Sequence, residues 1–97
     1  MKYRFDFSLF YSPTQAYGCV TGYIETPGSA TPGTLIALLE ESEAGAGLAL
    51  RVNSVLPPKV DSFATLMLED HLAEGRISAE TLARRLEVQG RYFVDVY

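Results

Sequence analysis

With 97 residues, of which 47% are hydrophobic and 21% charged, the chain has the size and composition of one globular domain spanning residues 1–97. Its net charge of −4 argues against a general affinity for nucleic acid, because such affinity depends on a basic surface that releases phosphate counterions. One cysteine permits no internal disulfide, and the sequence has neither the apolar core of a signal peptide nor a membrane-length apolar run, so we expect a soluble cytoplasmic protein.

Two strands joined as a hairpin are predicted at the start of the chain. In residues 2–11, aromatic or apolar side chains occupy every odd position and polar ones stand at 2, 4, 6 and 8, and residues 17–25 are again aromatic and β-branched. Residues 12–16 between them contain Pro13 and have the composition of a turn. Both segments are therefore expected to enter one antiparallel sheet.

The register of this hairpin decides what each face of the sheet carries. We expect Leu9 opposite Cys19 and Phe5 opposite Tyr23, which gives a ring-rich face that forms the core. The second face would then carry three apolar residues that are available to a partner: Phe10, Val20 and Ile24.

The loop "GSATPGT" (residues 28–34) raises the question of a phosphate site. Gly28 and Gly33 have the spacing of a P-loop, but Thr34 and Leu35 stand where that motif needs a lysine and a magnesium-binding hydroxyl. We therefore interpret the loop as a turn, in which Thr31 caps a following helix.

That helix is expected to be about ten residues long, with Pro32 in its first position and with Leu35, Ile36, Leu38 and Leu39 as its apolar residues. Three acidic residues, Glu40, Glu41 and Glu43, would stand at its C-terminal end, where the helix dipole disfavours negative charge. They form either a solvated cluster or part of a surface that meets a partner.

The remaining elements follow in chain order. Residues 48–56 alternate as a third strand that Pro57 stops, and Asp61 or Ser62 can cap a helix reaching about Glu74. Ser78 can cap a further helix over 78–88, and "RYFVDVY" is a terminal strand. The sequence thus predicts an α+β domain of order ββαβααβ, with a four-stranded, mainly antiparallel sheet and helices packed on one face.

The stretch "ISAETLARRLEV" (residues 77–88) resembles the first helix of a helix-turn-helix DNA-binding domain. The resemblance implies a role for Arg84 and Arg85 at a nucleic acid. A recognition helix should follow, however, and here a strand is expected instead. The two arginines are also explained as cations in the last turn of a solvated helix.

Cys19 and His71 are the candidates for a nucleophile and its base. The sequence shows no recognised spacing of metal ligands, and no metal or cofactor is expected. Cys19 on a ring-rich sheet face is more typical of a small buried thiol than of a reactive one.

The six tyrosines are the remaining signal, because tyrosine favours core margins and protein interfaces. We expect a non-catalytic protein-binding module, an inhibitor or adaptor, that also forms a homodimer through the second sheet face or an edge strand. The alternatives are a DNA-associated regulator that uses the helix at 78–88 and, third, a small-ligand binder or enzyme that uses Cys19. The residues expected at the partner surface are Phe10, Tyr11, Tyr17, Val20, Ile24, Glu40, Glu41, Glu43 and Tyr97.

Overall fold

A computed structural model describes residues 1–43, 45–59 and 62–97 of the chain. These residues form seven strands and one helix. In chain order the elements are β1 (Lys2–Ser12), β2 (Gln15–Glu25), β3 (Leu35–Leu39), β4 (Leu48–Leu56), β5 (Thr65–Leu68), β6 (His71–Leu72), α1 (Arg76–Val88) and β7 (Phe93–Val96).

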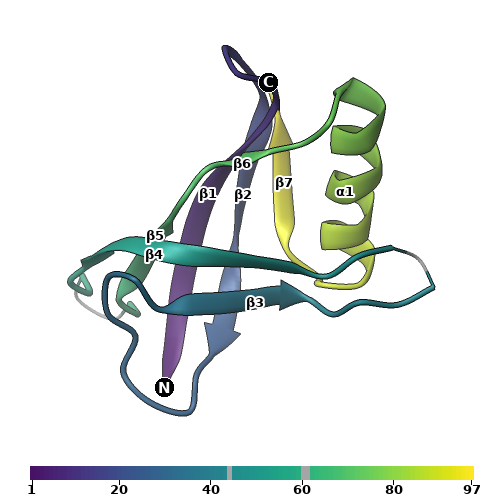
Figure 1. The fold of residues 1–97 in the computed structure, drawn as a ribbon. Coiled ribbons are helices and arrows are strands. Elements are labelled where there is room, and N and C mark those ends of the chain that lie inside the picture. The colour runs from purple at the N-terminus through teal and green to yellow at the C-terminus, as the bar shows by residue number, and fades with distance from the viewer. Residues whose placement is uncertain (44, 60–61) are drawn as a thin grey trace.

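The strands form one curled mixed sheet in the order β3-β4-β5-β1-β2-β7, with β6 beside β1. Both β5 and β6 run parallel to β1, and the other neighbours are antiparallel. Figure 1 shows β3 and β4 running across the direction of β1, β2 and β7, with α1 standing beside β7. The curl brings β3 and β7, the first and last strands of this order, toward each other around the core.

The predicted α+β sheet of four strands with three helices is therefore wrong. The described residues are mostly β-structure, and α1 is their one helix. At 13 residues, that helix is neither long nor apolar enough to cross a membrane. It begins at Arg76, two residues before the predicted cap Ser78, and Gly75 occupies the N-cap position without a side-chain hydrogen bond.

The β1–β2 hairpin is confirmed, but its register differs by one residue from the predicted one. Phe5 pairs with Gly22 and Leu9 with Gly18, where the prediction paired them with Tyr23 and Cys19. Because successive side chains of a strand point to opposite faces, a one-residue shift exchanges the two faces of β2. Val20 therefore faces the core.

The loop 28–34 turns the chain, as predicted, but it leads into a strand and not a helix. The Thr34 N–H donates to the Thr31 carbonyl across 3.0 Å, and Gly33 has a φ of 93°. Proline followed by a glycine with positive φ is typical of a type II turn. Pro32 is thus a turn residue rather than the first residue of a helix.

Pairing with β4 makes residues 35–39 a strand. Ile36 and Leu38 are buried and Leu35 and Ala37 are exposed, which is a period of two. Ile36 lies opposite Leu50 of β4. A five-residue apolar run fits a helix or a strand equally well, so the neighbouring strand decides.

The helix predicted up to Glu74 is likewise wrong, and strands β5 and β6 occupy its place. Leu66 and Leu68 alternate into the core from β5, and Leu66 lies beside Phe5 of β1. Apolar residues at 63, 66 and 67 suit a helical period, but those at 66 and 68 also suit a strand. Of the two expected caps, Asp61 lies outside the described residues and Ser62 precedes an extended segment.

Tyr92, just before β7, closes the curled sheet. Its ring meets the Phe5 ring edge to face at a centroid distance of 4.9 Å, and its hydroxyl donates to the Leu38 carbonyl of β3 across 3.0 Å. Gly22 leaves room for this packing: a Cβ there would stand 2.7 Å from Tyr92 Cδ1 and 3.0 Å from Phe5 Cε2. The Tyr92 side chain thereby links the start of β7 to β3, the strand at the other end of the sheet order.

Replacing Gly22 should therefore destabilise the fold. We expect Gly22→Ala to lower the free energy of unfolding by about 1–3 kcal/mol, because overpacking forces both rings to move. Gly28→Ala is the matched control, since a Cβ at Gly28 meets nothing within 4 Å. Urea denaturation of both variants measures the difference, and equal midpoints would show that the rings do not pack against Gly22.

Candidate functional site

The register of the sheet gathers a set of side chains on the face opposite the core. Arg4 pairs with Tyr23 and Thr65, and Asp6 pairs with Thr21 and Met67. Directly paired residues lie on the same face of a sheet. We call this the outer face, and its residues are Lys2, Arg4, Asp6 and Ser8 of β1, Cys19, Thr21, Tyr23 and Glu25 of β2, Ser54 and Leu56 of β4, Thr65 and Met67 of β5, and Phe93 and Asp95 of β7.

No described element covers the outer face. All of its residues are exposed or half-buried, including Phe93 at 69% and Tyr23 at 52% exposure. Helix α1 instead buries Ala79, Ala83 and Leu86 against the inner side. A sheet face with exposed rings and no cover is a candidate binding surface.

A groove of about 610 Å³ lies at one end of the outer face. Its lining residues come from β1, β2, β4, β5 and the segment after β4: Arg4, Asp6, Tyr23, Leu56, Pro57, Lys59, Ser62, Phe63, Thr65 and Met67. The Tyr23 and Phe63 rings meet edge to face at 5.9 Å, and Lys2 Nζ lies 5.6 Å from the first ring centroid and 5.4 Å from the second. We call this the outer groove.

Cys19 lies on the outer face, with a thiol that stays protonated at neutral pH. Its Sγ donates to Asp6 Oδ1 across 3.1 Å. Burial, and then the hydrogen bond and negative charge of Asp6, raise the pKa of the Cys19 thiol to about 11. A nucleophilic cysteine needs the opposite shift, because the thiolate is the reactive form.

The sheet does not bring Cys19 and His71 together. Cys19 pairs with Ser8 of β1, whereas His71 pairs with Leu9, the next residue along the same strand. Neighbouring residues of a strand point to opposite faces, so the two side chains lie on opposite sides of the sheet. Burial lowers the pKa of His71, which keeps the imidazole neutral at pH 7.

Four of the residues expected at a partner surface lie at the hairpin end of the sheet. Phe10, Tyr11 and Tyr17 are half-buried there, and Tyr97 is 72% exposed. The Tyr97 N–H donates to the Tyr17 carbonyl across 3.0 Å. Figure 1 shows the C-terminus beside the tip of the β1–β2 hairpin, so these residues share one region although they are far apart in sequence.

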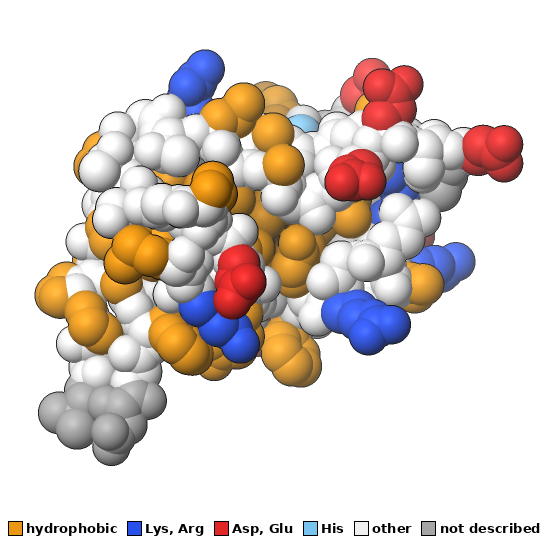
Figure 2. Space-filling view, turned by 90° about the horizontal axis from the view of Figure 1, so that it is seen from below, with side chains coloured by type: hydrophobic (Ala, Val, Ile, Leu, Met, Phe, Trp, Pro, Cys, Tyr) orange, Lys and Arg blue, Asp and Glu red, His pale blue; other side chains and the backbone are white. Residues whose placement is uncertain are grey.

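The other expected partner residues lie elsewhere. Val20 is fully buried and Ile24 is half-buried against the core, so the expected second face containing them does not exist. Glu40, Glu41 and Glu43 are exposed in the segment between β3 and β4, not at a helix end. Figure 2 shows acidic side chains at the right-hand end of the molecule, where this segment lies in Figure 1, with Lys and Arg side chains beside them.

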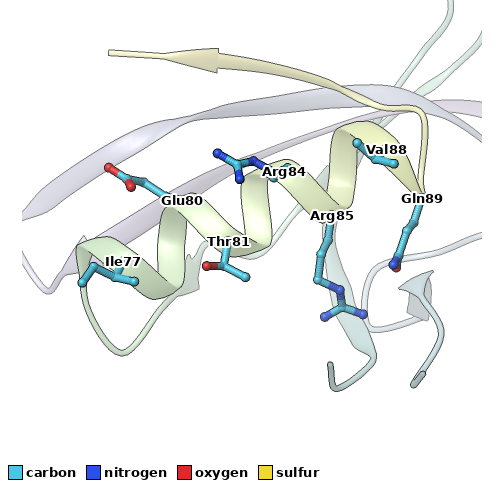
Figure 3. Close-up of a pocket in the computed structure, with 7 residues that line it drawn as sticks. All are labelled: Ile77, Glu80, Thr81, Arg84, Arg85, Val88 and Gln89. Carbon is cyan, nitrogen blue, oxygen red and sulfur yellow. The ribbon is translucent and has the colours of Figure 1, made fainter. Parts of the chain in front are cut away.

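The solvent side of α1 carries a shallow groove of about 340 Å³ whose lining includes both arginines of the helix-turn-helix resemblance. Arg85 is not available there, because its guanidinium donates to the Ala46 carbonyl across 2.8 Å and to the Gly45 carbonyl across 3.5 Å. Figure 3 shows Arg85 leaving the helix on the side of Thr81, and Arg84 leaving it on the side of Glu80. The strand β7 follows α1 where a recognition helix would stand.

Sequence reasoning missed the exposed rings of the outer face. The predicted register of the hairpin places Tyr23 on the core face, and the sequence pattern assigns no role to Phe93. Gly22 offered a signal: a glycine opposite Phe5 gives room for a second ring on the core side. With Gly22 facing the core, Tyr23 must face outward.

The sequence matches no protein-family model, and it shows no significant similarity to a curated protein or to a solved structure.

Cys19 should react slowly with alkylating agents. A thiol with a pKa of about 11 has a thiolate population at pH 8 roughly 200 times smaller than that of free cysteine, and its greater nucleophilicity recovers only about tenfold of this. We expect iodoacetamide to modify native Cys19 at least about tenfold more slowly than free cysteine. Asp6→Asn should speed the reaction, because it removes the carboxylate charge; a native rate equal to that of free cysteine would contradict the assignment.

Arg85 should act as a structural tether. Arg85→Gln removes both donors to the segment between β3 and β4, and we expect faster amide hydrogen exchange there and a loss of about 1 kcal/mol of stability. Arg84→Gln is the control, because Arg84 is an exposed residue of the same helix. Equal exchange in the two variants would show that Arg85 does not hold this segment.

Proposed function

We propose that this chain is a non-catalytic protein-binding module of the cytoplasm, an inhibitor or adaptor, that binds its partner through the outer face and the adjoining edge strand β7. The observation that carries the proposal is the exposure of large side chains along an edge strand: Phe93, Val96 and Tyr97 are 69%, 52% and 72% exposed. Aromatic residues on an uncovered surface are typical of the positions that dominate protein interfaces.

The backbone of β7 supports the proposal independently. β7 is the last strand in the sheet order, and among the strands that the structure describes it pairs with β2 alone. The Tyr97 N–H faces β2, and since hydrogen bonding alternates along an antiparallel strand, Val94 and Val96 direct their backbone groups to the side away from β2. An extended segment of a partner can add to such an edge as a further strand.

The state of Cys19 also favours binding over catalysis. The one thiol of the chain is held protonated by burial and by Asp6, and the one histidine stands on the other face of the sheet. The outer face thus offers rings and hydrogen-bonding groups, but no nucleophile paired with a base.

Two variants of β7 test this proposal. Phe93→Ser removes an exposed ring, and Val96→Pro removes an outward N–H without breaking a bond to β2. We expect each to reduce the partner retained by the immobilised chain from native lysate by about tenfold or more, as measured by mass spectrometry. Ile77→Ser, which removes an exposed apolar side chain from α1, is the matched control. Retention that is unchanged in both β7 variants, with circular dichroism showing intact folds, would rule out this surface.

A further inference from the structure

The outer groove is lined by more basic than acidic residues, although the chain as a whole has a net charge of −4. Among its described lining residues, Arg4 and Lys59 are cationic and Asp6 is the only acid. Asp6 already accepts a hydrogen bond from the Cys19 thiol. Lys2 adds a third cation at the rim, above the Tyr23 and Phe63 rings, and Glu25 stands opposite it on β2.

The cations of the outer groove are not used in ion pairs within the described part of the chain. The one ion pair found among those residues joins Arg76 to Glu80 on α1. Arg4 and Lys59 are both exposed, so each is available to a charge from outside. A charge-assisted hydrogen bond to a carboxylate is about twice as strong as a neutral one.

The acidic cluster lies at the opposite end of β4 from the outer groove. The segment with Glu40, Glu41 and Glu43 precedes β4, and the segment that lines the outer groove follows it. A strand of nine residues spans about 30 Å, which exceeds the Debye length of about 8 Å at physiological salt. The acidic cluster therefore does not neutralise the field at the outer groove.

The outer groove also has an apolar wall. Leu56 and Phe63 are 47% and 46% exposed, and Met67 is half-buried between them and β1. The volume of about 610 Å³ lies within the range of about 300–1,000 Å³ that is usual for pockets that enclose a bound organic group. Such a groove can take an aromatic or large aliphatic body with negative charge beside it.

The outer groove is continuous with the surface proposed above for the partner. On the outer face, Asp6, Thr21 and Phe93 form one row across β1, β2 and β7. Arg4 and Tyr23 form the next row on the same face. Neighbouring strands lie about 4.8 Å apart, so a chain bound at β7 needs only a few residues to reach Tyr23. This continuity favours a segment of the partner protein over a free small anion.

We propose that the outer groove binds an acidic segment of the partner, in which carboxylates meet Arg4 and Lys59 and an aromatic side chain packs against Tyr23, Phe63 and Leu56. The proposal rests on the protein-binding function and names the chemistry of the partner.

Three peptides test it on the full chain labelled with ¹⁵N: Ac-EEFEE-NH₂, Ac-EESEE-NH₂ and Ac-KKFKK-NH₂. We expect the first to shift the amide signals of Arg4, Tyr23, Phe63 and Thr65, and to bind at least about fivefold more tightly than the second, which lacks the apolar anchor. The basic peptide should not bind. Equal binding by the basic peptide, or no shifts at the outer groove, would overturn the proposal.

A double variant supplies the control for charge. Arg4→Gln with Lys59→Gln should weaken Ac-EEFEE-NH₂ by about tenfold or more, and should remove most of the dependence of its affinity on salt. Arg84→Gln on α1 should change neither. If the double variant binds as well as the natural chain, the cations do not hold the peptide and the proposal fails.

Two further outcomes assign the outer groove to another occupant. Binding of AMP at the same amides with higher affinity than any peptide would indicate a free anionic ligand. Self-association in light scattering that Ac-EEFEE-NH₂ reverses would indicate the acidic segment of a second copy. Either result contradicts the proposal of an acidic partner segment. If Phe93→Ser loses the partner from native lysate but no peptide binds, the protein-binding function stands and only the acidic segment is ruled out.

Discussion

The packing of Tyr92 is the constraint on which the rest of this structure depends. A sheet that curls must bring together strands that are not hydrogen-bonded neighbours, and here the Tyr92 hydroxyl joins the end of α1 to the Leu38 carbonyl of β3. The ring fits because glycines stand on both sides: a Cβ at Gly90 would lie 2.4 Å from Tyr92 Cε2, and one at Gly22 would lie 2.7 Å from Cδ1. The same ring packs against Phe5, the centre of the core.

The position of Gly22 connects this closure to the candidate binding surface. With Gly22 opposite Phe5, the residues on either side of it in β2 must face outward. Tyr23 thereby comes to line the outer groove, and Val20 fills the core. A surface that carries rings and cations is thus a direct consequence of how the core is packed, because one strand serves both faces.

The acidic cluster and the outer groove lie at opposite ends of β4. Glu40, Glu41 and Glu43 stand in the segment before β4, whereas the segment after β4 helps to line the outer groove with its cations. Arg85 ties the segment before β4 to α1 through the carbonyls of Gly45 and Ala46, and Figure 2 shows basic side chains beside the acidic ones at this end. In the proposal made above, the cations of the outer groove, which adjoins β7, attract an acidic partner before contact.

The sequence by itself determined three parts of the fold whose hydrophobic pattern is long: the β1–β2 hairpin, β4 with its predicted bounds and the helix near 78–88. It also indicated the short terminal strand β7. Over nine or more residues a period of two cannot be confused with a period of 3.6. Tertiary structure decided the short apolar runs, since Leu35–Leu39 and Thr65–Leu68 became strands only by pairing with β4 and β1. Tertiary structure also decided the register of the hairpin, because the local hydrophobic pattern is compatible with two registers that differ by one residue. The register in turn decides on which face Val20, Cys19 and Tyr23 lie. A glycine has no side chain, so the sequence does not indicate which face of the strand Gly22 occupies. The rings of Phe5 and Tyr92 pack against Gly22 and fix the register, and Tyr92 reaches this position only in the folded chain.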